Sequence, residues 1–440
     1  MKKWRVVIVG AAGRDFHNFN TVYRDNPKVE VVAFTAAQIP EIAGRCYPPA
    51  LAGSFYPQGI PIKEEKDLEK IIKKNQVDEA VLSYSDLSYG TVMHLASRVM
   101  AAGAKFSLLG PRQTMLSSRK PVIAVLAVRT GCGKSQTARA VVEALRKAGK
   151  KVASVRHPMP YGELEKQAVQ KYQTLEDLKK HHCTIEEMEE YEPHIVMGSL
   201  IFAGVDYERI LKEAEKEAEV IVWDGGNNDL SFYHPDLTIT VVDPLRAGHE
   251  LKYYPGEVNF RTADVILINK IDSAKPGQIK TLLDNARLVN PRAKIIKSES
   301  ILRVDKPEVI AGKKVLVIED GPTLTHGGMK IGAGVVAAQR YKAAQLVDPR
   351  PFVIGKIKKT FKDYPDIGIL LPAMGYGAEQ MADLEQTINA VDCDSVVIAT
   401  PIDLARFIKI QKPHTRVGYE LSIAAKKELA AILRQKKFIT

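Results

Sequence analysis

Short apolar runs alternate with longer amphipathic segments along the 440 residues of this chain, and this alternation limits the possible fold more than any other feature. Continuous apolar runs of strand length, rich in β-branched residues, suit strands that are buried on both faces of a parallel sheet. We therefore predict an α/β protein with repeated β-α units and doubly wound, mostly parallel sheets. The runs lie at residues 5–10, 29–34, 79–84, 122–128, 151–157, 219–225, 237–242, 264–269, 293–296, 314–320, 367–372 and 395–400, and helices are predicted between them, for example at 66–74, 135–148, 207–218 and 379–390.

A glycine-rich turn follows the strand predicted at residues 122–128 and leads into an amphipathic helix, in the sequence VIAVLAVRTGCGKSQTARAVVEAL. Binding of a nucleotide phosphate requires small residues that let backbone N–H groups converge, a lysine for the β and γ oxygens, a hydroxyl for Mg²⁺ and a helix N-terminus. The segment meets each requirement, although Val128 stands where the strict GxxxxGK[ST] pattern has its first glycine. The alternative is a plain glycine turn whose lysine faces solvent. We predict a P-loop whose nucleotide-binding residues are Thr130, Gly131, Cys132, Gly133, Lys134, Ser135 and Gln136.

A second motif for the same site is the apolar strand at residues 219–225, which delivers Asp224 and is followed by glycine. An acid at the carboxyl end of such a strand completes the magnesium site of P-loop enzymes, and glycine leaves room for a γ-phosphate. We therefore predict Ser135 and Asp224 as Mg²⁺ ligands, and Lys134, Arg129 and Asp224 as catalytic residues. The alternative is that Asp224 only ends a turn.

A third motif, NKID, follows the strand predicted at residues 264–269. It resembles the [NT]KxD motif of GTPases, in which the aspartate accepts hydrogen bonds from guanine and the lysine packs along the base. We predict base contacts from Asn269, Lys270 and Asp272, with residues 297–300 closing the pocket. Asp272 can also bond the amino group of adenine, so the motif leaves both ATP and GTP open. A polar turn after a buried strand is the alternative.

The chain opens as strand, glycine turn and helix, in the sequence RVVIVGAAGRDFHNFN. The dinucleotide fingerprint GxGxxG lacks its middle glycine here and no ribose-binding acid follows, so a Rossmann-like fold with another task is predicted. Ligands of open α/β sheets gather at the carboxyl ends of the strands. Basic side chains at such places are predicted to bind an anionic substrate, or else to cap helices and pair with surface acids. They are Arg14, His17, Arg156, His157, His326 and Lys330.

The net charge of +11 fits either a small polyanionic substrate or a solvated, lysine-rich surface. No long basic block or basic aromatic stretch points to nucleic acid, and no run of about 18 apolar residues predicts a membrane span. The four cysteines are too widely spaced for a CxxC metal site and too few for a disulfide framework. Because no signal-like apolar stretch follows the first residues, we predict a cytoplasmic protein without nucleic-acid or membrane partners, and a homo-oligomer is left open.

The length of the chain exceeds one ordinary core, so two or three domains are expected. The polar segment 117–121 ends in proline before a new strand and marks the first boundary, and a weaker break lies near 311–314. We predict a Rossmann-like N-terminal domain at 1–118, a P-loop nucleotide-binding core at 119–312, and a C-terminal α/β region at 313–440 that can be continuous with the core.

Together these segments resemble the cyclic 2,3-diphosphoglycerate synthetase family, whose relatives are often labelled predicted GTPases. The resemblance extends over essentially the whole chain and rests on GAAGRDFHNFN, VRTGCGKSQT, WDGGNND, NKID, THGGM and ATPIDL. It implies an ATP-dependent, ligase- or kinase-like synthetase that closes 2,3-diphosphoglycerate to a cyclic pyrophosphate and releases ADP and phosphate. Arg129 also resembles the signature lysine of deviant P-loop ATPases, which neutralises γ-phosphate charge. The alternatives are a regulatory or chaperone GTPase and a non-enzymatic module that binds a nucleotide or a phosphorylated metabolite.

Overall fold

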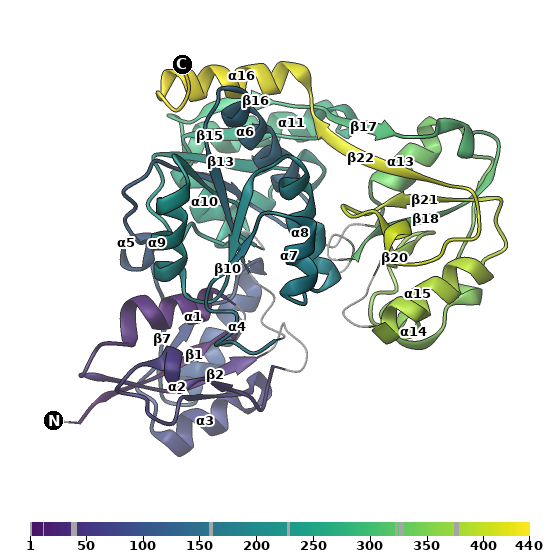
Figure 1. Cartoon of the computed structure of the whole chain (residues 1–440). Coiled ribbons are helices and arrows are strands. Elements are labelled where there is room, and N and C mark those ends of the chain that lie inside the picture. Colours follow the sequence, from purple (N-terminus) through teal and green to yellow (C-terminus); the bar gives the residue numbers. More distant parts are fainter. Residues whose placement is uncertain are drawn as a thin grey trace.

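The computed structural model describes residues 2–11, 13–36, 42–157, 162–226, 229–321, 324, 330–373 and 378–440. Within them the chain forms three large sheets with helices packed on them (Figure 1). Nearly all neighbouring strands in these sheets run parallel, and the antiparallel pairs are formed by edge strands. The prediction of an α/β protein with mostly parallel sheets is confirmed. In the described part of the chain, no helix combines the length and the apolar composition that crossing a membrane requires.

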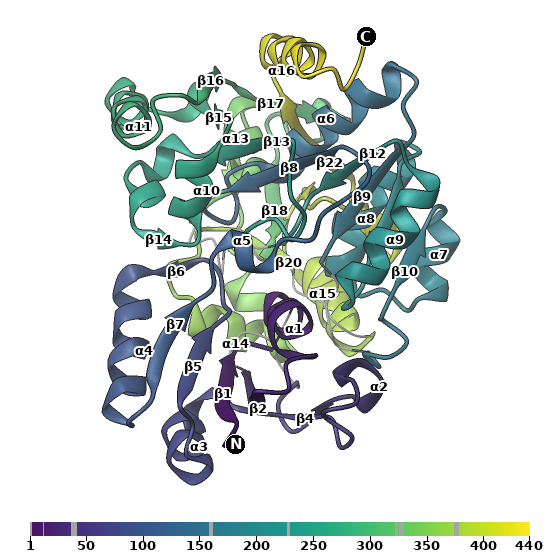
Figure 2. The same ribbon diagram turned by 90° about the vertical axis from the view of Figure 1, so that its left-hand side faces the viewer.

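The N-terminal sheet has the strand order β3-β4-β2-β1-β5-β7. Leu68, Ile71 and Ile72 recur at helical spacing in α3 and pack with Val92 and Leu95 of α4, which covers the same part of the sheet (Figure 2). The strands are β1 (Trp4–Val9), β2 (Val29–Ala36), β3 (Cys46–Tyr47), β4 (Ile60–Glu64), β5 (Glu79–Leu82) and β7 (Lys105–Leu108), and the helices are α1 (Arg14–Asn18), α2 (Pro49–Ala52), α3 (Leu68–Asn75), α4 (Tyr89–Ala101) and α5 (Pro111–Thr114).

The central sheet is the largest, with the strand order β10-β11-β9-β12-β8-β13-β15-β16. Its strands are β8 (Val122–Ala127), β9 (Val152–Arg156), β10 (Gln170–Tyr172), β11 (Leu200–Ala203), β12 (Val220–Trp223), β13 (Leu237–Val242), β15 (Val265–Ile268) and β16 (Lys294–Lys297). Its helices are α6 (Lys134–Lys147), α7 (Leu175–Lys180), α8 (Ile185–Val196), α9 (Tyr207–Glu217), α10 (Gly256–Thr262) and α11 (Pro276–Val289).

The strand β8 shows why the apolar runs in the sequence are continuous. Val122 and Ala124 pack in one cluster with α9, whereas Ile123 and Val125 pack in another with α6. Because both faces are covered, every residue of the strand is buried. The chain moves from β8 to β9 on one side and later adds β13 on the other, so the carboxyl ends of β8, β12 and β13 meet where the winding direction reverses.

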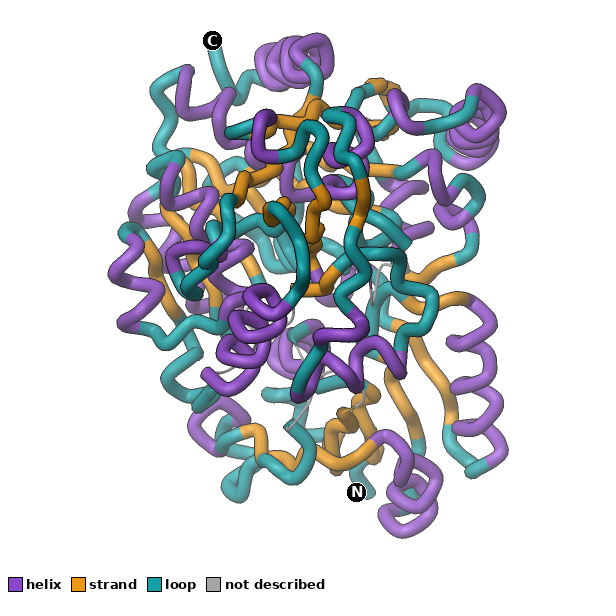
Figure 3. Tube along the Cα trace, turned by 90° about the vertical axis from the view of Figure 1, so that its right-hand side faces the viewer, coloured by secondary structure: helices purple, strands orange, loops and turns teal. Residues whose placement is uncertain are grey.

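The C-terminal sheet has the order β17-β22-β21-β18-β19, and β20 also pairs with β18. Figure 3 views the molecule from the side on which this sheet lies in Figure 1. From β22 the chain returns to the central sheet through α16, where Leu429 and Leu433 pack in the same cluster as Leu145 of α6. The strands are β17 (Ser300–Val304), β18 (Lys314–Asp320), β19 (Gln345–Leu346), β20 (Leu371–Ala373), β21 (Ser395–Ala399) and β22 (His414–Leu421), with helices α13 (Ala333–Arg340), α14 (Gly355–Asp363), α15 (Ala378–Ala390) and α16 (Ile423–Gln435). Domain boundaries near 118 and 312 stay predictions.

The N-terminal sheet is joined to the central part by a short antiparallel ladder between β6 (Leu87–Ser88) and β14 (Tyr253–Tyr254). A second connection is the ion pair between Arg14 and Asp229, both of which are buried. The connections lie near the carboxyl ends of the central strands, because Asp229 belongs to the loop that follows β12. The candidate site therefore lies where two sheets meet.

Candidate functional site

The glycine turn, residues 128–133, connects β8 to α6. Gly131 has φ of +80° and Gly133 has φ of +106°, backbone conformations that favour glycine. A Cβ on Gly133 would also lie 2.1 Å from Nδ2 of Asn269, so the close approach of the next motif requires glycine at this position. Lys134 and Ser135 are the first two residues of α6 and stand directly after the turn. This is the local arrangement that binds anions at a helix N-terminus.

The charged groups at this edge of the sheet gather around the side chain of Asp224. It is fully buried, its Oδ1 lies 2.5 Å from Nζ of Lys134, and its Oδ2 pairs with Arg156 and lies 3.3 Å from Nε2 of His194. Burial alone would raise the pKa of the Asp224 carboxyl, but the charges of Arg156 and Lys134 outweigh it and hold the pKa well below its ordinary value. Arg156 also donates from Nε to Glu190 at 3.1 Å, so its guanidinium bridges two acids.

The NKID motif contacts the glycine turn directly. Nδ2 of Asn269 donates to the carbonyl of Cys132 at 3.0 Å, and Nζ of Lys270 donates to the carbonyl of Gly131 at 2.6 Å and lies 3.0 Å from Asp243. Asp272 is placed differently, because its Oδ1 accepts a hydrogen bond from the backbone N–H of Ser300 at 2.9 Å. Two of the three predicted base-contacting residues thus support the turn itself.

Gln136 lies one helical position beyond Ser135 and is 2% exposed. Neither Oε1 nor Nε2 of its amide has a hydrogen-bond partner among the described residues. A Cβ on Gly133 would lie 2.6 Å from this Nε2, which shows that the amide reaches the turn. Buried amides without partners are rare in folded proteins, so this pair of atoms fits a ligand at the turn.

Arg14, the first residue of α1, and His157, which follows β9, come together at Asp229. Nη1 of Arg14 lies 3.1 Å from Oδ1 of Asp229, and Nε2 of His157 lies 3.8 Å from its Oδ2. Burial raises the pKa of Asp229 to about 7 in spite of the opposing charge of Arg14, and burial together with nearby cations lowers the pKa of His157 to about 3. A Cβ on Gly13 would lie 2.6 Å from Nδ1 of His157, so the first glycine-rich turn packs against this histidine.

Of the other predicted substrate residues, His17 packs on the same ring, Phe232, as His157, and Lys330 lies elsewhere. His17 lies in the core, stacked on Phe232 at 4.0 Å, with its Nε2 2.6 Å from the carbonyl of Thr114. Burial lowers the pKa of His17 to about 3, so the neutral ring donates to that carbonyl. Lys330 is exposed beside the C-terminal sheet, and His326 lies outside the described residues.

The glycine turn also has partners that the sequence motifs do not indicate. Arg129 and Thr130 both bind Asp86, which comes from the loop after β5. His194, in the interior of α8, likewise carries no motif that links it to Asp224. Asp243 could have been predicted from the sequence as a site residue, because it follows the apolar run 237–242 directly, as Asp224 follows its own strand.

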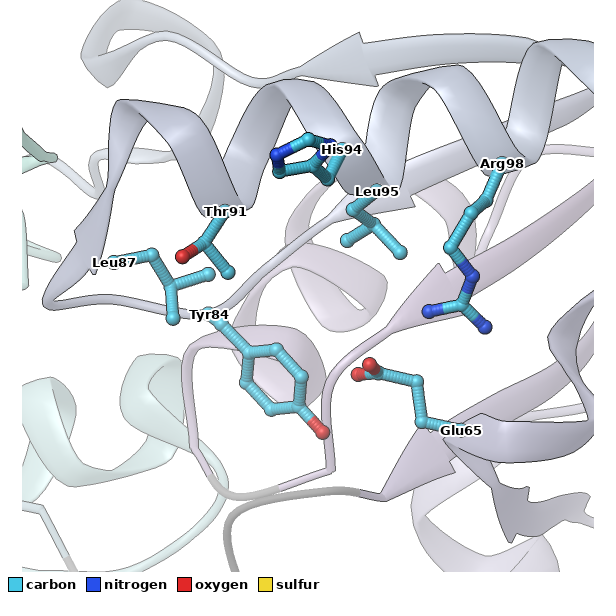
Figure 4. Close-up of a pocket in the computed structure, with 7 residues that line it drawn as sticks. All are labelled: Glu65, Tyr84, Leu87, Thr91, His94, Leu95 and Arg98. Carbon is cyan, nitrogen blue, oxygen red and sulfur yellow. The ribbon is translucent and has the colours of Figure 1, made fainter.

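A cavity of about 310 Å³ lies beside α4 in the N-terminal part of the chain (Figure 4). The side chains of Glu65 and Arg98 point toward each other at one end, near the hydroxyl of Tyr84. None of the predicted site residues lines this cavity. Its lining residues are Glu65, Tyr84, Leu87, Thr91, His94, Leu95 and Arg98.

Fold and site together define an α/β protein with a glycine turn before a helix N-terminus and a buried lysine–aspartate pair, both at the winding reversal of its largest sheet. Arginine synthetase ArcE of Thermococcus kodakarensis is 60% identical over 434 residues, which cover 99% of this chain and 97% of the relative. The chain belongs to the family of this arginine synthetase. No protein-family model matches the chain.

Two solved structures give only distant likenesses. LpxK from Aquifex aeolicus, in complex with ATP, has a TM-score of 0.42 and 11% identity, with 79% of this chain and 96% of LpxK covered. The murein peptide ligase Mpl from Psychrobacter arcticus has a TM-score of 0.28 and 13% identity, with 90% of this chain and 84% of Mpl covered. Likenesses at this level carry no conclusion about the chain.

The relative corrects the expected function. The predicted membership in the cyclic 2,3-diphosphoglycerate synthetase family is wrong, and so is the predicted closure of 2,3-diphosphoglycerate, because the close relative is an arginine synthetase. The alternatives of a regulatory GTPase and of a non-enzymatic binding module are wrong for the same reason. The expectation of a synthetase agrees with the family.

Proposed function

We propose that this protein makes arginine by transferring the γ-phosphoryl group of ATP to a ureido oxygen and then replacing that oxygen with ammonia. The product is suggested by the relative, and the observation that carries the nucleotide step is the Lys134–Asp224 pair at the end of the glycine turn. A lysine at this position lies where it reaches the β- and γ-phosphates of a nucleotide. That placement supports transfer of the γ-phosphoryl group, with ADP as product.

The acceptor follows from the chemistry of the product. Citrulline differs from arginine only by a ureido oxygen in place of one nitrogen of the guanidinium group. In the first step the ureido oxygen forms a bond to the γ-phosphorus, and the bond from phosphorus to ADP breaks. In the second step the nitrogen of ammonia bonds to the ureido carbon, the C–O bond breaks, and phosphate leaves with that oxygen. The sum is citrulline, ATP and ammonia giving arginine, ADP and phosphate.

The site residues take corresponding roles in this proposal. Lys134 and Arg129 neutralise the transferring phosphoryl group, and the residues of the glycine turn with Ser135 and Gln136 hold the phosphates. Arg14, Asp229 and His157 lie between two sheets and are proposed to bind the charged amino-acid end of the substrate. Arg156 acts indirectly, because its guanidinium is engaged by two acids.

We infer that ATP is used rather than GTP. An aspartate of the [NT]KxD type bonds guanine through two N–H groups, whereas one oxygen of Asp272 is already engaged by the backbone of Ser300. Asn269 and Lys270 remain useful with either base, because they support the glycine turn.

We propose that Ser135 and Asp224 would hold Mg²⁺ on a bound nucleotide, and the oxygens of Asp224 are engaged by Lys134 and Arg156 in this structure. Among the described residues no group of three His, Cys, Asp or Glu side chains could hold a metal ion. Nucleotide-bound Mg²⁺ needs only one or two protein oxygens, because phosphates and water supply the others. The ion would supply charge neutralisation on the phosphates.

The finer architecture belongs to the same proposal. We infer that residues 119–312 form a P-loop nucleotide-binding core, with a Rossmann-like domain at 1–118 and an α/β region at 313–440. The position of β8 between β12 and β13 supports this, since the glycine turn then lies at the winding reversal of the sheet.

The test is arginine formation by the purified protein with ATP, Mg²⁺, ammonium and citrulline. Arginine and ADP should form in equal amounts, and omission of citrulline or ammonium should stop arginine formation. Lys134→Met, which lacks the charge but keeps much of the side-chain length, should be inactive. ADP formation that never yields arginine would contradict the proposal.

A further inference from the structure

The carboxylate of Asp86 binds two neighbouring residues of the glycine turn, Arg129 and Thr130. Its Oδ1 lies 2.5 Å from Nε of Arg129, and its Oδ2 accepts from the hydroxyl of Thr130 at 2.7 Å and from the backbone N–H of Thr130 at 3.2 Å. Asp86 lies in the loop between β5 of the N-terminal sheet and β6 of the short ladder with β14. A residue that follows a strand of the N-terminal sheet thus binds the turn of the central sheet.

The far side of the Arg129 guanidinium is held as well. Its Nη1 donates to Nδ1 of His249 at 2.7 Å, and the guanidinium carbon lies 3.7 Å from the centre of the Tyr253 ring. Burial and the charge of Arg129 lower the pKa of His249 to about 4, so the neutral ring is able to accept this hydrogen bond. Arg129 is 6% exposed. Its direction is therefore fixed from two sides.

The backbone at Asp86 has an unusual conformation. Its φ of +59° lies in the left-handed region, which most residues other than glycine avoid and which aspartate and asparagine tolerate best. The next two residues, Leu87 and Ser88, form the strand that pairs with Tyr253 and Tyr254. The β6–β14 ladder thus holds the chain directly after Asp86 in place, and the Asp86 carboxylate contacts the glycine turn.

We propose that Asp86 is a positioning residue for phosphoryl transfer, and this inference rests on the proposed function of the site. Asp86 holds the start of the glycine turn and directs Arg129, so that catalysis depends on the docked N-terminal sheet. The residue does not touch the nucleotide in this proposal. Loss of its carboxylate should lower kcat more than it changes the KM for ATP, because Lys134 and the N-terminus of α6 still bind the phosphates. A small misplacement in an active site lowers rates by about 100-fold.

Two substitutions remove the carboxylate without straining the backbone. Asp86→Asn keeps the left-handed conformation and one acceptor oxygen, and Asp86→Gly keeps only the conformation. We expect kcat to fall from wild type to Asn to Gly, by at least about tenfold for Gly, while the KM for ATP changes by less than about threefold. Tyr89→Phe is the matched control, since it removes a 2.5 Å hydrogen bond to Glu257 that also joins the N-terminal sheet to the central part.

A second measurement keeps the inference separate from the proposed reaction. Amide hydrogen exchange at residues 128–133 should be faster in Asp86→Gly than in wild type and unchanged in Tyr89→Phe, whatever the substrate is. If wild type makes no arginine but hydrogen exchange changes in this way, the proposed function fails, while the inference that Asp86 holds the glycine turn in place is supported. Unchanged exchange and kcat in Asp86→Gly, or equal losses in Tyr89→Phe, would overturn the inference.

Discussion

Replacement of Asp224 by asparagine probes the buried charges on which the site depends. Asp224 is fully buried, and its two cationic partners are nearly so, with side-chain exposures of 13% for Lys134 and 1% for Arg156. Asparagine keeps the shape but removes the negative charge. Its amide nitrogen would then face an N–H donor of one of these cations, and both cations would lose their main counter-charge.

The expected loss of folding free energy is large. Removing one partner of a buried ion pair destabilises a protein by about 3–5 kcal/mol, because the other charge stays buried without compensation. Asp224→Asn leaves two buried cations without the Asp224 carboxylate, although Arg156 still contacts Glu190. We therefore expect the free energy of unfolding to fall by an amount within this range. Lys134→Met should destabilise the protein less, because Asp224 keeps Arg156 and the hydrogen bond from His194.

Urea denaturation of the ligand-free proteins, followed by circular dichroism, measures this difference. A several-domain chain can unfold in steps, so the transition that contains the central sheet is the one to compare. Asp224→Asn should shift this transition to lower urea concentration than Lys134→Met does, while both variants lose arginine formation. Equal stability of wild type and Asp224→Asn would refute the buried-charge reasoning.

Three further changes test two other residues of the site and a buried acid, Glu319, in β18 of the C-terminal sheet. Gly133→Ala should abolish nucleotide binding. Calorimetry should show that it also lowers the free energy of unfolding by more than the ~1 kcal/mol expected from left-handed backbone strain. Gly149→Ala is the control, because φ is +80° there and no atom lies within 4 Å of the new Cβ, so it should lower the free energy of unfolding only by that strain. Burial raises the pKa of Glu319 from 4.5 to about 8, so the folded state keeps a proton that the unfolded state loses. Stability should therefore fall as pH rises between these values, by up to about 1.4 kcal/mol per pH unit, and the pH-dependent melting of Glu319→Gln should be flatter; an identical slope would contradict this. Asp272→Asn should change the KM for ATP by less than about threefold, and a loss of about tenfold or more would show that the carboxylate reads the base.

The sequence predicted well the parts of the fold that are buried on both sides. β8 and β18 appear as continuous apolar runs because each is covered on both faces. β22 was not predicted, because its buried residues alternate with partly exposed ones such as His414 and Arg416. Its pairing with β17 depends on a segment more than 100 residues away in the chain, which no local pattern contains.

The candidate site was predictable where a motif dictates local geometry. Lys134 and Asp224 lie together, as expected for two motifs that follow adjacent strands at the same sheet edge, and their roles in catalysis and metal binding stay predictions. His194 and Asp86 could not be found in this way, since each reaches the site through packing between distant segments. Residue type alone did not separate them from other surface or core residues.

The substrate was predicted wrongly for a related reason. The turn, the acidic strand and NKID all lie around the proposed nucleotide, so they describe how phosphates are handled. They contain little about the second substrate, whose proposed contacts come from Arg14, His157 and Asp229 in separate segments. The resemblance therefore identified a synthetase and missed its product, although it also rested on segments outside these motifs, such as GAAGRDFHNFN and THGGM.

Transfer of oxygen from the ureido group to phosphate is the most direct test of the proposed chemistry. The protein is supplied with citrulline labelled with ¹⁸O in the ureido group, together with ATP, Mg²⁺ and ammonium, and the products are analysed by ³¹P NMR and mass spectrometry. Our account predicts that ADP forms, that each arginine is matched by one phosphate, and that this phosphate carries the ¹⁸O. Formation of AMP, ¹⁸O in AMP, or unlabelled phosphate accompanying arginine would contradict it.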